Sequence, residues 1–176
     1  MRALIFLGVF LTSQTALAQD TLTEERIRDF YQKSVDVQLQ GEEPSVAHMK
    51  KHMHKESTIT MHLVTNVTGM PSHKETRVHS KRDAIKETRE GYKLGKLKTI
   101  ENNVISYEIA SDGRTAKVKD TTYMTFVINV PTPKGIVSFN AEQSALCDND
   151  ISVNEENTII INNSVCNAEA KLTPIN

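Results

Sequence analysis

The chain has no large excess of charge of either sign. Its 176 residues carry 21 Lys and Arg side chains against 22 Asp and Glu side chains. Proteins that bind nucleic acid through the phosphate backbone need a clear surplus of basic side chains. The near-neutral balance therefore argues against nucleic acid as a main partner. The sequence also lacks internal repeats and low-complexity stretches.

Long apolar runs are absent after the first 18 residues, so 19–176 contains no predicted membrane anchor. Residues 1–18 begin with Arg2, continue through the apolar run Ala3 to Leu11, and end in Ala16-Leu17-Ala18. This pattern is typical of a secretory signal peptide. We therefore expect an exported protein, periplasmic or secreted, with one domain over residues 19–176.

Sequence motifs of the common enzyme classes are also missing. There is no G-x-S-x-G, P-loop, H-E-x-x-H or dinucleotide-binding pattern. No cofactor is predicted.

Cysteine is scarce, and the two that are present, Cys147 and Cys166, form an expected pair. Export to an oxidising compartment favours a disulfide. An antiparallel pairing around the turn 154–157 places Glu155 opposite Thr158 and Cys147 opposite Cys166. Two free, buried thiols are the alternative.

A long β-hairpin is predicted over 99–129, because two alternating runs meet at Asp112-Gly113. This pair is typical of a two-residue type I′ turn. That turn pairs Ile109 with Ala116, Tyr107 with Val118 and Ile105 with Asp120, and a phase shift at 104–105 predicts a bulge. One face then carries Ile105, Tyr107, Ile109, Ala116, Val118, Asp120, Met124, Phe126 and Ile128.

Three helices and three further strands complete the predicted order α-α-β-α-β-β-β-β. We expect helices over 21–40 (with a capping box at Thr21 and Glu24), 46–55 (capped by Ser45) and 81–92. The stripe of the third helix, Ala84, Ile85, Thr88 and Tyr92, is narrow. Strands are expected over 57–68, 136–148 and 158–172, with a polar loop or ribbon tip over 69–78. This is an α+β fold, with one curved antiparallel sheet covered by helices on one face.

Several of these segments resemble the nuclear transport factor 2-like superfamily, which includes ketosteroid isomerase and polyketide-cyclase-like proteins. They are the Phe30-Tyr31 helix, the short helix running into Ile59-Thr60-Met61, the Ser80-Lys81 helix start and the Ala110 to Ala116 connection. The resemblance implies a cone-shaped α+β fold with a pocket and frequent dimerisation through the sheet. It does not imply one reaction, since members include isomerases, dehydratases, binding modules and assembly factors.

Asp120 is the one acid on the predicted apolar face, which makes it a candidate general base. Tyr107 on the facing strand is the candidate hydroxyl donor, and His62 a further polar group. The alternative is a structural acid near a strand end, paired with a lysine such as Lys98 or facing solvent.

All six histidines lie within residues 48–79, and His48 and His52 are spaced to share one helix face. This spacing can bind copper or zinc. The alternative is an ordinary solvated helix end. The stretch from Lys81 to Lys98 is rich in Lys and Arg; it is typical of a solvated face, with an anionic ligand or membrane surface as the alternative.

The sequence therefore favours an exported, non-catalytic binding or assembly module that holds a small apolar ligand or a protein partner, with a homodimer through the sheet as an option. One alternative is a small isomerase or dehydratase that uses Asp120. The other is a periplasmic copper- or zinc-binding protein that uses His48 and His52.

Overall fold

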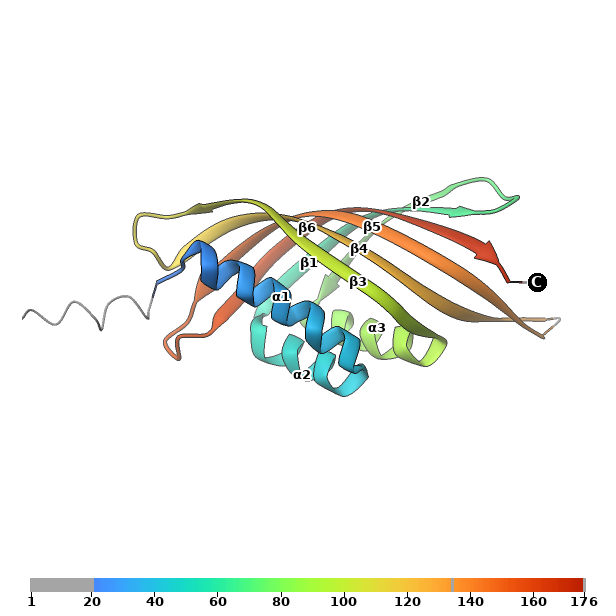
Figure 1. Cartoon of the computed structure of the whole chain (residues 1–176), viewed down its shortest axis with the longest axis horizontal. Coiled ribbons are helices and arrows are strands. Elements are labelled where there is room, and N and C mark those ends of the chain that lie inside the picture. Colours follow the sequence, from blue (N-terminus) through green and yellow to red (C-terminus); the bar gives the residue numbers. More distant parts are fainter. Residues whose placement is uncertain (1–20, 134, 176) are drawn as a thin grey trace, which may run out of the picture.

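The computed structural model describes residues 21–133 and 135–175, which place three helices on one face of a curved, unclosed sheet (Figure 1). The helices are α1 (Glu24–Gln40), α2 (Glu42–His52) and α3 (Lys81–Leu94). The strands are β1 (Met53–Val67), β2 (His73–Ser80), β3 (Gly95–Ile109), β4 (Thr115–Thr132), β5 (Gly135–Val153) and β6 (Ile159–Pro174). The predicted α+β class is confirmed. The predicted signal peptide lies outside the described residues.

The six strands lie in the order β2-β1-β6-β5-β4-β3. Every neighbouring pair is antiparallel except β1 and β6, which run parallel. The sheet is therefore mixed, whereas a purely antiparallel sheet was predicted. The parallel pair is possible because α3 and four strands separate β1 from β6 along the chain, which provides the long crossover that parallel pairing requires.

Strand β2 corrects the predicted loop over 69–78. It pairs antiparallel with β1, from Thr58 opposite Ser80 to Thr65 opposite His73. It forms one edge of the sheet, and its one buried residue is His79. An edge strand with both faces near solvent needs no alternation of apolar and polar residues, so the pattern used for the other strands does not detect it.

The helix starts differ from the prediction at two places. The side chain of Thr23, and not Thr21, caps α1 by accepting a hydrogen bond from the backbone of Arg26 at 3.2 Å. Gly41 has a φ of 117° and lets α2 begin directly at Glu42. Ser45 is therefore inside α2, where its hydroxyl donates to the Gly41 carbonyl at 2.7 Å.

The connection between β3 and β4 is wider than the predicted two-residue turn. The backbone of Ala110 bonds to that of Thr115 at 2.9 Å, which leaves four residues in the loop. Only Gly113 has a positive φ there, whereas a type I′ turn needs two such residues. The Asp112 carboxylate accepts from the Arg114 backbone at 2.7 Å and so stabilises the wider loop.

The predicted bulge in β3 is confirmed, and it corrects the position of one residue. Val104, and not Ile105, lies opposite Asp120, while Tyr107 pairs with Val118 as expected. Val104 is buried, and Ile105 is 51% exposed. The extra residue of the bulge turns Ile105 away from the core.

Cys147 and Cys166 form the predicted disulfide and lie opposite each other, with their Cα atoms 4.1 Å apart. Next to the turn, Val153 pairs with Ile159, which is one residue out of the predicted register. A register shift between Asp150 and Ile151 then brings the two cysteines together. The disulfide therefore joins β5 and β6 in the middle of the sheet.

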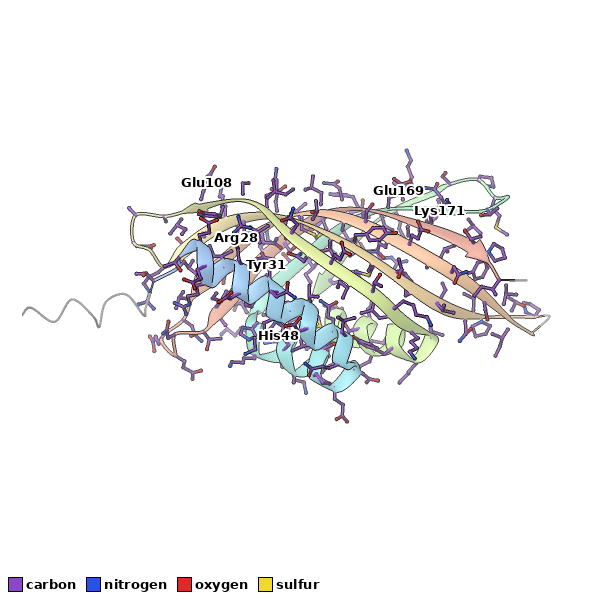
Figure 2. The ribbon with its side chains drawn as sticks, viewed as in Figure 1. Arg28, Tyr31, His48, Glu108, Glu169 and Lys171 are labelled. Atoms are coloured by element: carbon purple, nitrogen blue, oxygen red, sulfur yellow. A yellow bond between two sulfur atoms is a disulfide. The ribbon has the colours of Figure 1, made fainter. Side chains whose placement is uncertain are left out.

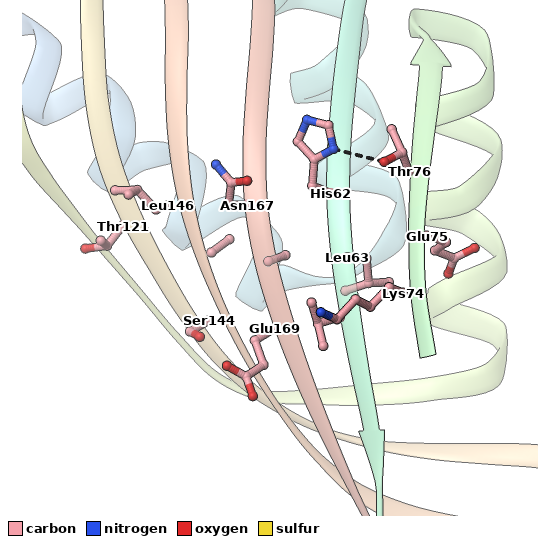
Figure 3. A pocket seen from close by; sticks show the side chains of 13 residues that line it. His62, Leu63, Lys74, Glu75, Thr76, Thr121, Ser144, Leu146, Asn167 and Glu169 are labelled. Atoms are coloured by element: carbon pink, nitrogen blue, oxygen red, sulfur yellow. Dashed lines mark hydrogen bonds between the residues drawn. The ribbon is translucent and has the colours of Figure 1, made fainter. Parts of the chain in front are cut away.

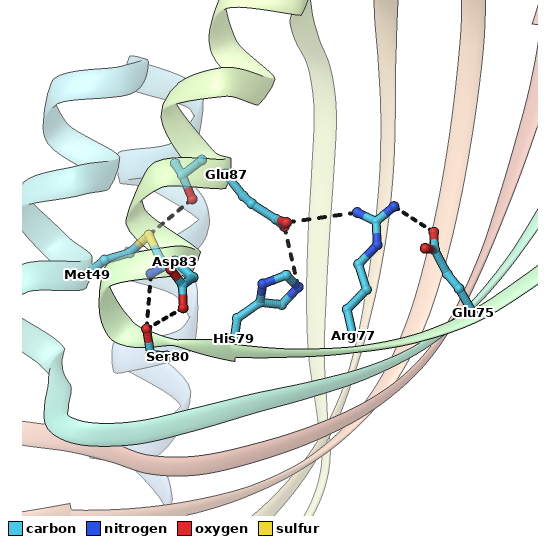
Figure 4. A network of polar contacts seen from close by, with 8 residues as sticks. Met49, Glu75, Arg77, His79, Ser80, Asp83 and Glu87 are labelled. Carbon is cyan, nitrogen blue, oxygen red and sulfur yellow. Dashed lines mark hydrogen bonds and ion pairs between the residues drawn. The ribbon is translucent and has the colours of Figure 1, made fainter.

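Helix α3 is attached to β2 by a surface network of charged groups (Figure 4). The Glu87 carboxylate lies 3.4 Å from the His79 ring and 3.9 Å from Arg77, which also contacts Glu75 at 2.6 Å. At the helix start, Ser80 caps α3 by accepting from the Asp83 backbone.

Among the described residues, none of the helices is both long and apolar enough to span a membrane.

Candidate functional site

Helix α1 seals one end of the helix-covered sheet surface with a cluster that we call the α1 core. Ile27, at 0% exposure, lies at its centre, because α1 places its large apolar residues on one face. The cluster consists of Leu22, Ile27, Phe30, Tyr31, Val104, Ala116, Val118, Ile151, Val153 and Ile159. Its centre, at Ile27, is closed to solvent.

Asp120 lies beside the α1 core, 3% exposed and enclosed by donors. Its two carboxylate oxygens accept from Nδ2 of Asn102 at 2.5 Å and from Nδ2 of Asn149 at 2.6 Å. A longer bond from Thr122 measures 3.4 Å, and Ser164 in turn donates to Asn149 at 2.6 Å. The acid is therefore part of a polar network that spans β3, β4, β5 and β6.

The environment of Asp120 favours its neutral form. Burial raises the pKa of its carboxyl, against the opposing effect of the bonds from Asn102, Asn149 and Thr122. Burial raises the pKa of the Tyr31 phenol on α1, and the nearby charge of Asp120 raises it further. Within the described residues, the Tyr31 hydroxyl and Oδ1 of Asn102 are buried without a hydrogen-bond partner.

Tyr107 is not assembled with Asp120. Its hydroxyl donates to the carboxylate of Glu24, at the start of α1, at 2.5 Å. That bond lowers the pKa of Glu24 and raises the pKa of Tyr107. The phenol next to Asp120 is therefore Tyr31, which Figure 2 shows on the helix side of the sheet.

His62 lies on the opposite face of the sheet from Asp120. The pairing places His62, Asn167, Leu146 and Thr121 in one row across β1, β6, β5 and β4. This row lines a shallow trough of about 760 Å³ on the outer surface, where the His62 ring bonds to Thr76 at 3.0 Å (Figure 3). The structure therefore does not bring His62 together with Asp120 or Tyr107.

His48 and His52 do lie side by side, with ring centres 4.3 Å apart, between α1 and α2. Nε2 of His48 is 2.8 Å from the Ser34 hydroxyl, and Nδ1 of His52 donates to the Ile159 carbonyl at 2.8 Å. Phe30 packs against both rings. In residues 21–133 and 135–175, no group of three His, Cys, Asp or Glu side chains is arranged to hold a metal ion.

The pKa values of both histidines are lower than that of an exposed imidazole, which favours the neutral form. Burial, the neighbouring His52 and the nearby Lys33 and Lys51 lower the pKa of His48 to about 4. Burial also lowers the pKa of His52, although its bond to Ile159 opposes this. The pair therefore acts in the structure as packed, uncharged aromatic surface at neutral pH.

A groove of about 310 Å³ lies where α3 meets β3 and β4, and we call it the α3 groove. Its lining is mostly apolar: Gln38, Thr88, Gly91, Tyr92, Leu94, Gly95, Lys96, Leu97, Met124, Phe126, Ile128 and Val130. Leu94 is 46% exposed and Val130 37% exposed. A contiguous exposed apolar surface of this kind is typical of a binding site.

Gly95 allows the start of β3 to lie close to β4 at this groove. A Cβ atom on Gly95 would lie 2.5 Å from the Val127 carbonyl oxygen and 3.0 Å from the Ile128 side chain. A side chain at position 95 would therefore push the start of β3 away from β4.

The polar side chains that line the α3 groove are mostly occupied inside the protein. The Tyr92 hydroxyl donates to the Gln38 carbonyl at 2.6 Å and lies 2.8 Å from the Ser45 hydroxyl. The Gln38 amide donates to the Ser34 carbonyl, and the Thr88 hydroxyl contacts the Met49 sulfur. The groove therefore offers a ligand mainly apolar surface.

Sequence reasoning placed the groove residues Met124, Phe126 and Ile128 on the apolar face but did not separate them from the core. The signal that could have done so is the narrow stripe of α3, whose side chains are too few and too small to cover the sheet. Tyr31 was missed as a neighbour of Asp120, because an apolar helix stripe does not reveal which strand residues it contacts.

Comparisons with known proteins give likenesses of fold. An NTF2-like protein from Cytophaga hutchinsonii is 11% identical with a TM-score of 0.46, covering 84% of this chain and 99% of that chain. A ketosteroid isomerase-like protein from Erwinia carotovora atroseptica is 8% identical with a TM-score of 0.45, covering 81% and 92%. A hexachlorocyclohexane dehydrochlorinase of type 2 is 11% identical with a TM-score of 0.49, covering 85% and 86%. These likenesses concern the fold alone. No family model and no curated protein matches the sequence.

Proposed function

We propose that this chain is an exported binding protein that holds a small apolar ligand in the α3 groove and does not transform it. The observation that carries the proposal is the groove itself, an apolar hollow of about 310 Å³ between α3 and the β3–β4 pair. Pockets of this size and lining are typical of small-molecule sites.

The chemistry of the groove supports binding without catalysis. Acid–base catalysis needs a titratable group within hydrogen-bond reach of the substrate. The lining contains no Asp, Glu, His or Cys, and its hydroxyl groups are bonded to other parts of the protein. Asp120, the buried acid, is not among the lining residues.

Export is supported by the disulfide between Cys147 and Cys166, since such bonds persist in oxidising compartments. The N-terminal pattern of residues 1–18 points the same way. We therefore propose that the ligand is met outside the cytoplasm, in the periplasm or the extracellular space.

The test is native mass spectrometry of the mature protein purified from its own host compartment. We expect a retained organic mass that leaves on denaturation. Val130→Glu should release it, because a carboxylate in the apolar lining loses its hydration on ligand binding. Asn129→Glu is the matched control. Asn129 is the exposed neighbour of Val130 on β4, and its side chain points to the other face of the sheet.

The same pair of variants is then titrated with the uncharged dye N-phenyl-1-naphthylamine. An empty native protein, together with equal dye binding by Val130→Glu and Asn129→Glu, would overturn the proposal.

A second candidate function is a small isomerase or dehydratase, and one observation favours it. The Tyr31 hydroxyl is buried without a partner in the described part of the chain, next to a carboxyl whose pKa is raised. A neutral carboxylic acid and a phenol that meet at one point can stabilise a developing oxyanion. In this reading Tyr31 takes the donor role first given to Tyr107.

Asp120→Asn separates the two functions. Turnover of a carbonyl substrate by the unmodified protein, lost in Asp120→Asn, would establish the enzyme. Unchanged ligand retention in Asp120→Asn, with no turnover in either protein, is the result expected of the binding protein.

A further inference from the structure

Helix α3 carries a stripe of cations on its exposed side, and the α3 groove does not use it. The stripe consists of Arg82, Lys86, Arg89 and Lys93, which are all exposed and follow one another at intervals of three or four residues. Side chains at these intervals share one face of a helix. None of the four is among the residues that line the α3 groove. The stripe is therefore a separate feature of the surface.

Two other segments bring further cations to the same place. The stripe borders a shallow hollow of about 820 Å³, which also receives Lys50 from the end of α2 and Lys55 from the start of β1. Lys81 ties α3 to the end of α2, because its Nζ donates to the backbone carbonyl of Lys50 at 2.6 Å. We call this hollow the basic trough; besides the stripe, its lining consists of Lys50, Lys55, Lys81, Ile85 and Glu90.

The cations of the basic trough are only loosely neutralised. Among the ion pairs of the described residues, none involves Lys50, Lys81 or Lys93. The other four cations of the lining pair with acids at distances of 3.8 to 4.0 Å, and all of these side chains are exposed. Exposed pairs of this kind contribute little to stability. An anionic partner can therefore replace them at small cost.

The acids of α3 limit the width of this positive surface. Asp83, Glu87 and Glu90 follow the stripe on one side of the helix, and Glu87 contacts His79 and Arg77 of β2 (Figure 4). A broad anionic surface such as a membrane would meet these acids as well as the cations. Along the helix, by contrast, the stripe extends for roughly 16 Å, which is too long for one small anion. The shape therefore favours an extended chain with repeated negative charges.

The lining of the basic trough distinguishes between two kinds of charged chain. Proteins hold single-stranded nucleic acid through cations together with aromatic side chains that stack on the bases. Among the described residues that line the trough, none is aromatic. Clusters of Lys and Arg without such a stacking surface suit sulfated or carboxylated glycans, which bind mainly through their charges. An exported protein also meets glycans of this kind at cell surfaces.

We infer that the basic trough binds a linear anionic glycan, whose sulfate or carboxylate groups meet the cation stripe of α3 while Lys50 and Lys55 add cations from α2 and β1. The choice of a glycan rests on the proposed export. The site itself is separate from the α3 groove, so the protein has one surface for an apolar molecule and another for a charged chain.

The experiment titrates the mature protein at low salt with three oligosaccharides of equal length: a sulfated heparin fragment, an oligogalacturonate and a neutral malto-oligosaccharide. Isothermal titration calorimetry measures binding. We expect at least one anionic oligosaccharide to bind and the neutral one not to bind. Added salt should weaken the binding, since screening acts on exposed charges. The tighter of the two anionic oligosaccharides identifies the acidic group.

Lys86→Gln combined with Lys93→Gln should weaken this binding roughly tenfold, because two exposed ion pairs to the glycan are lost. The matched control is Lys117→Gln combined with Lys171→Gln, which removes the same charge from exposed residues of β4 and β6. This control should change the affinity less than about twofold, since distant exposed charges are screened.

A change of the opposite sign tests the same surface. Glu90→Gln should strengthen the binding, because it removes the one acid among the described residues that line the basic trough. Glu108→Gln is its control, since Glu108 is an exposed acid of β3 that does not line the trough.

Each of the remaining outcomes overturns the inference. It is wrong if neither anionic oligosaccharide binds, or if the two double variants lose affinity equally, which would make the attraction a general property of the surface. Vesicles of phosphatidylglycerol and phosphatidylcholine test a membrane instead. Vesicle binding that depends on Lys86 and Lys93, without oligosaccharide binding, would replace the glycan by a lipid surface. Binding of N-phenyl-1-naphthylamine should be unchanged by Lys86→Gln with Lys93→Gln, so failure here leaves the proposed function of the α3 groove intact.

Discussion

The α1 core and the α3 groove are built on the same two strands, yet one is sealed and the other is open. Val104 of β3 and Val118 of β4 are buried under α1. Further along the same strands, Leu97 of β3 and Ile128 of β4 line a hollow beside α3. The difference therefore lies in the helices and not in the sheet.

Helix α1 buries four large side chains, Ile27, Phe30, Tyr31 and Val35, whereas the one buried residue of α3 is the small Ala84. A wide stripe of large side chains fills the space above a sheet, and a narrow stripe of small ones leaves part of it uncovered. The lesson is that one curved sheet can carry a stable core and a binding site, according to the width of the helix stripe packed on it. Four predictions test this contrast.

The largest effect is expected where the core is sealed. Ile27→Ala should lower the free energy of unfolding by roughly 2–5 kcal/mol, because it removes a fully buried side chain and leaves a cavity. Val130→Ala in the α3 groove should cost less than about 1 kcal/mol, because its side chain is already 37% exposed. Denaturant unfolding measures both. Equal losses would show that the groove is as important to folding as the core.

The disulfide lies between the two regions and should come next. Replacing Cys147 and Cys166 together by Ser should lower the free energy of unfolding by roughly 3 kcal/mol, since the crosslink joins two residues that are 19 positions apart in the sequence. Chemical denaturation of this variant beside the oxidised parent protein gives the difference. A loss well below 1 kcal/mol would mean that strand pairing alone holds β5 against β6.

Acid should act on the helix packing through His48. Its pKa is about 4 in the folded protein and about 6.5 when exposed, so the unfolded chain binds more protons between these values. Stability should therefore fall by roughly 1–3 kcal/mol as the pH drops from 6.5 towards 4.

The control for this pH effect is the exposed His73 on β2. His48→Gln should flatten the dependence and His73→Gln should not, as followed by thermal unfolding at several pH values. An unchanged slope in His48→Gln would assign the effect to another group.

The smallest effect is expected at Asp120. Because its pKa is raised in the folded protein, the free energy of unfolding falls as the pH rises above the ordinary pKa of an aspartate. Asp120→Asn should therefore increase stability at pH 7 by about 1 kcal/mol or less. Asn102 can turn its unpartnered Oδ1 towards the new amide. Unfolding curves against pH, with the exposed Asp150→Asn as reference, measure the change. A loss of stability would mean that the charged bonds to Asn102 and Asn149 outweigh the cost of burial.

Particular residues show how far the sequence could be interpreted. Ser80 as the start of α3 and the shift at Val104-Ile105 were predictable, because capping and strand alternation involve residues close in the chain. The pairing of Cys147 with Cys166 was predicted from a register that is locally off by one residue, and the shift at Asp150 corrects it.

Other features depended on contacts that no local pattern contains. Strand β2 is an edge strand that pairs with β1 alone, so its exposed residues gave no alternation to detect. Tyr31 rather than Tyr107 is the phenol whose pKa the charge of Asp120 raises, because the packing of α1 on the sheet decides which phenol lies near the acid. His62 was grouped with Asp120, although alternation along β1 and the order of the strands place it on the other face.

By itself, the sequence determined the element types outside β2, the apolar stripe of α1, the narrow stripe of α3 and the cysteine pair. Each of these follows from the spacing of residues along a helix or strand, which a local pattern records. Only the tertiary structure decided that the narrow stripe lies beside Met124, Phe126 and Ile128 and leaves a hollow there. These depend on which distant segments pack together, and packing is a property of the whole chain.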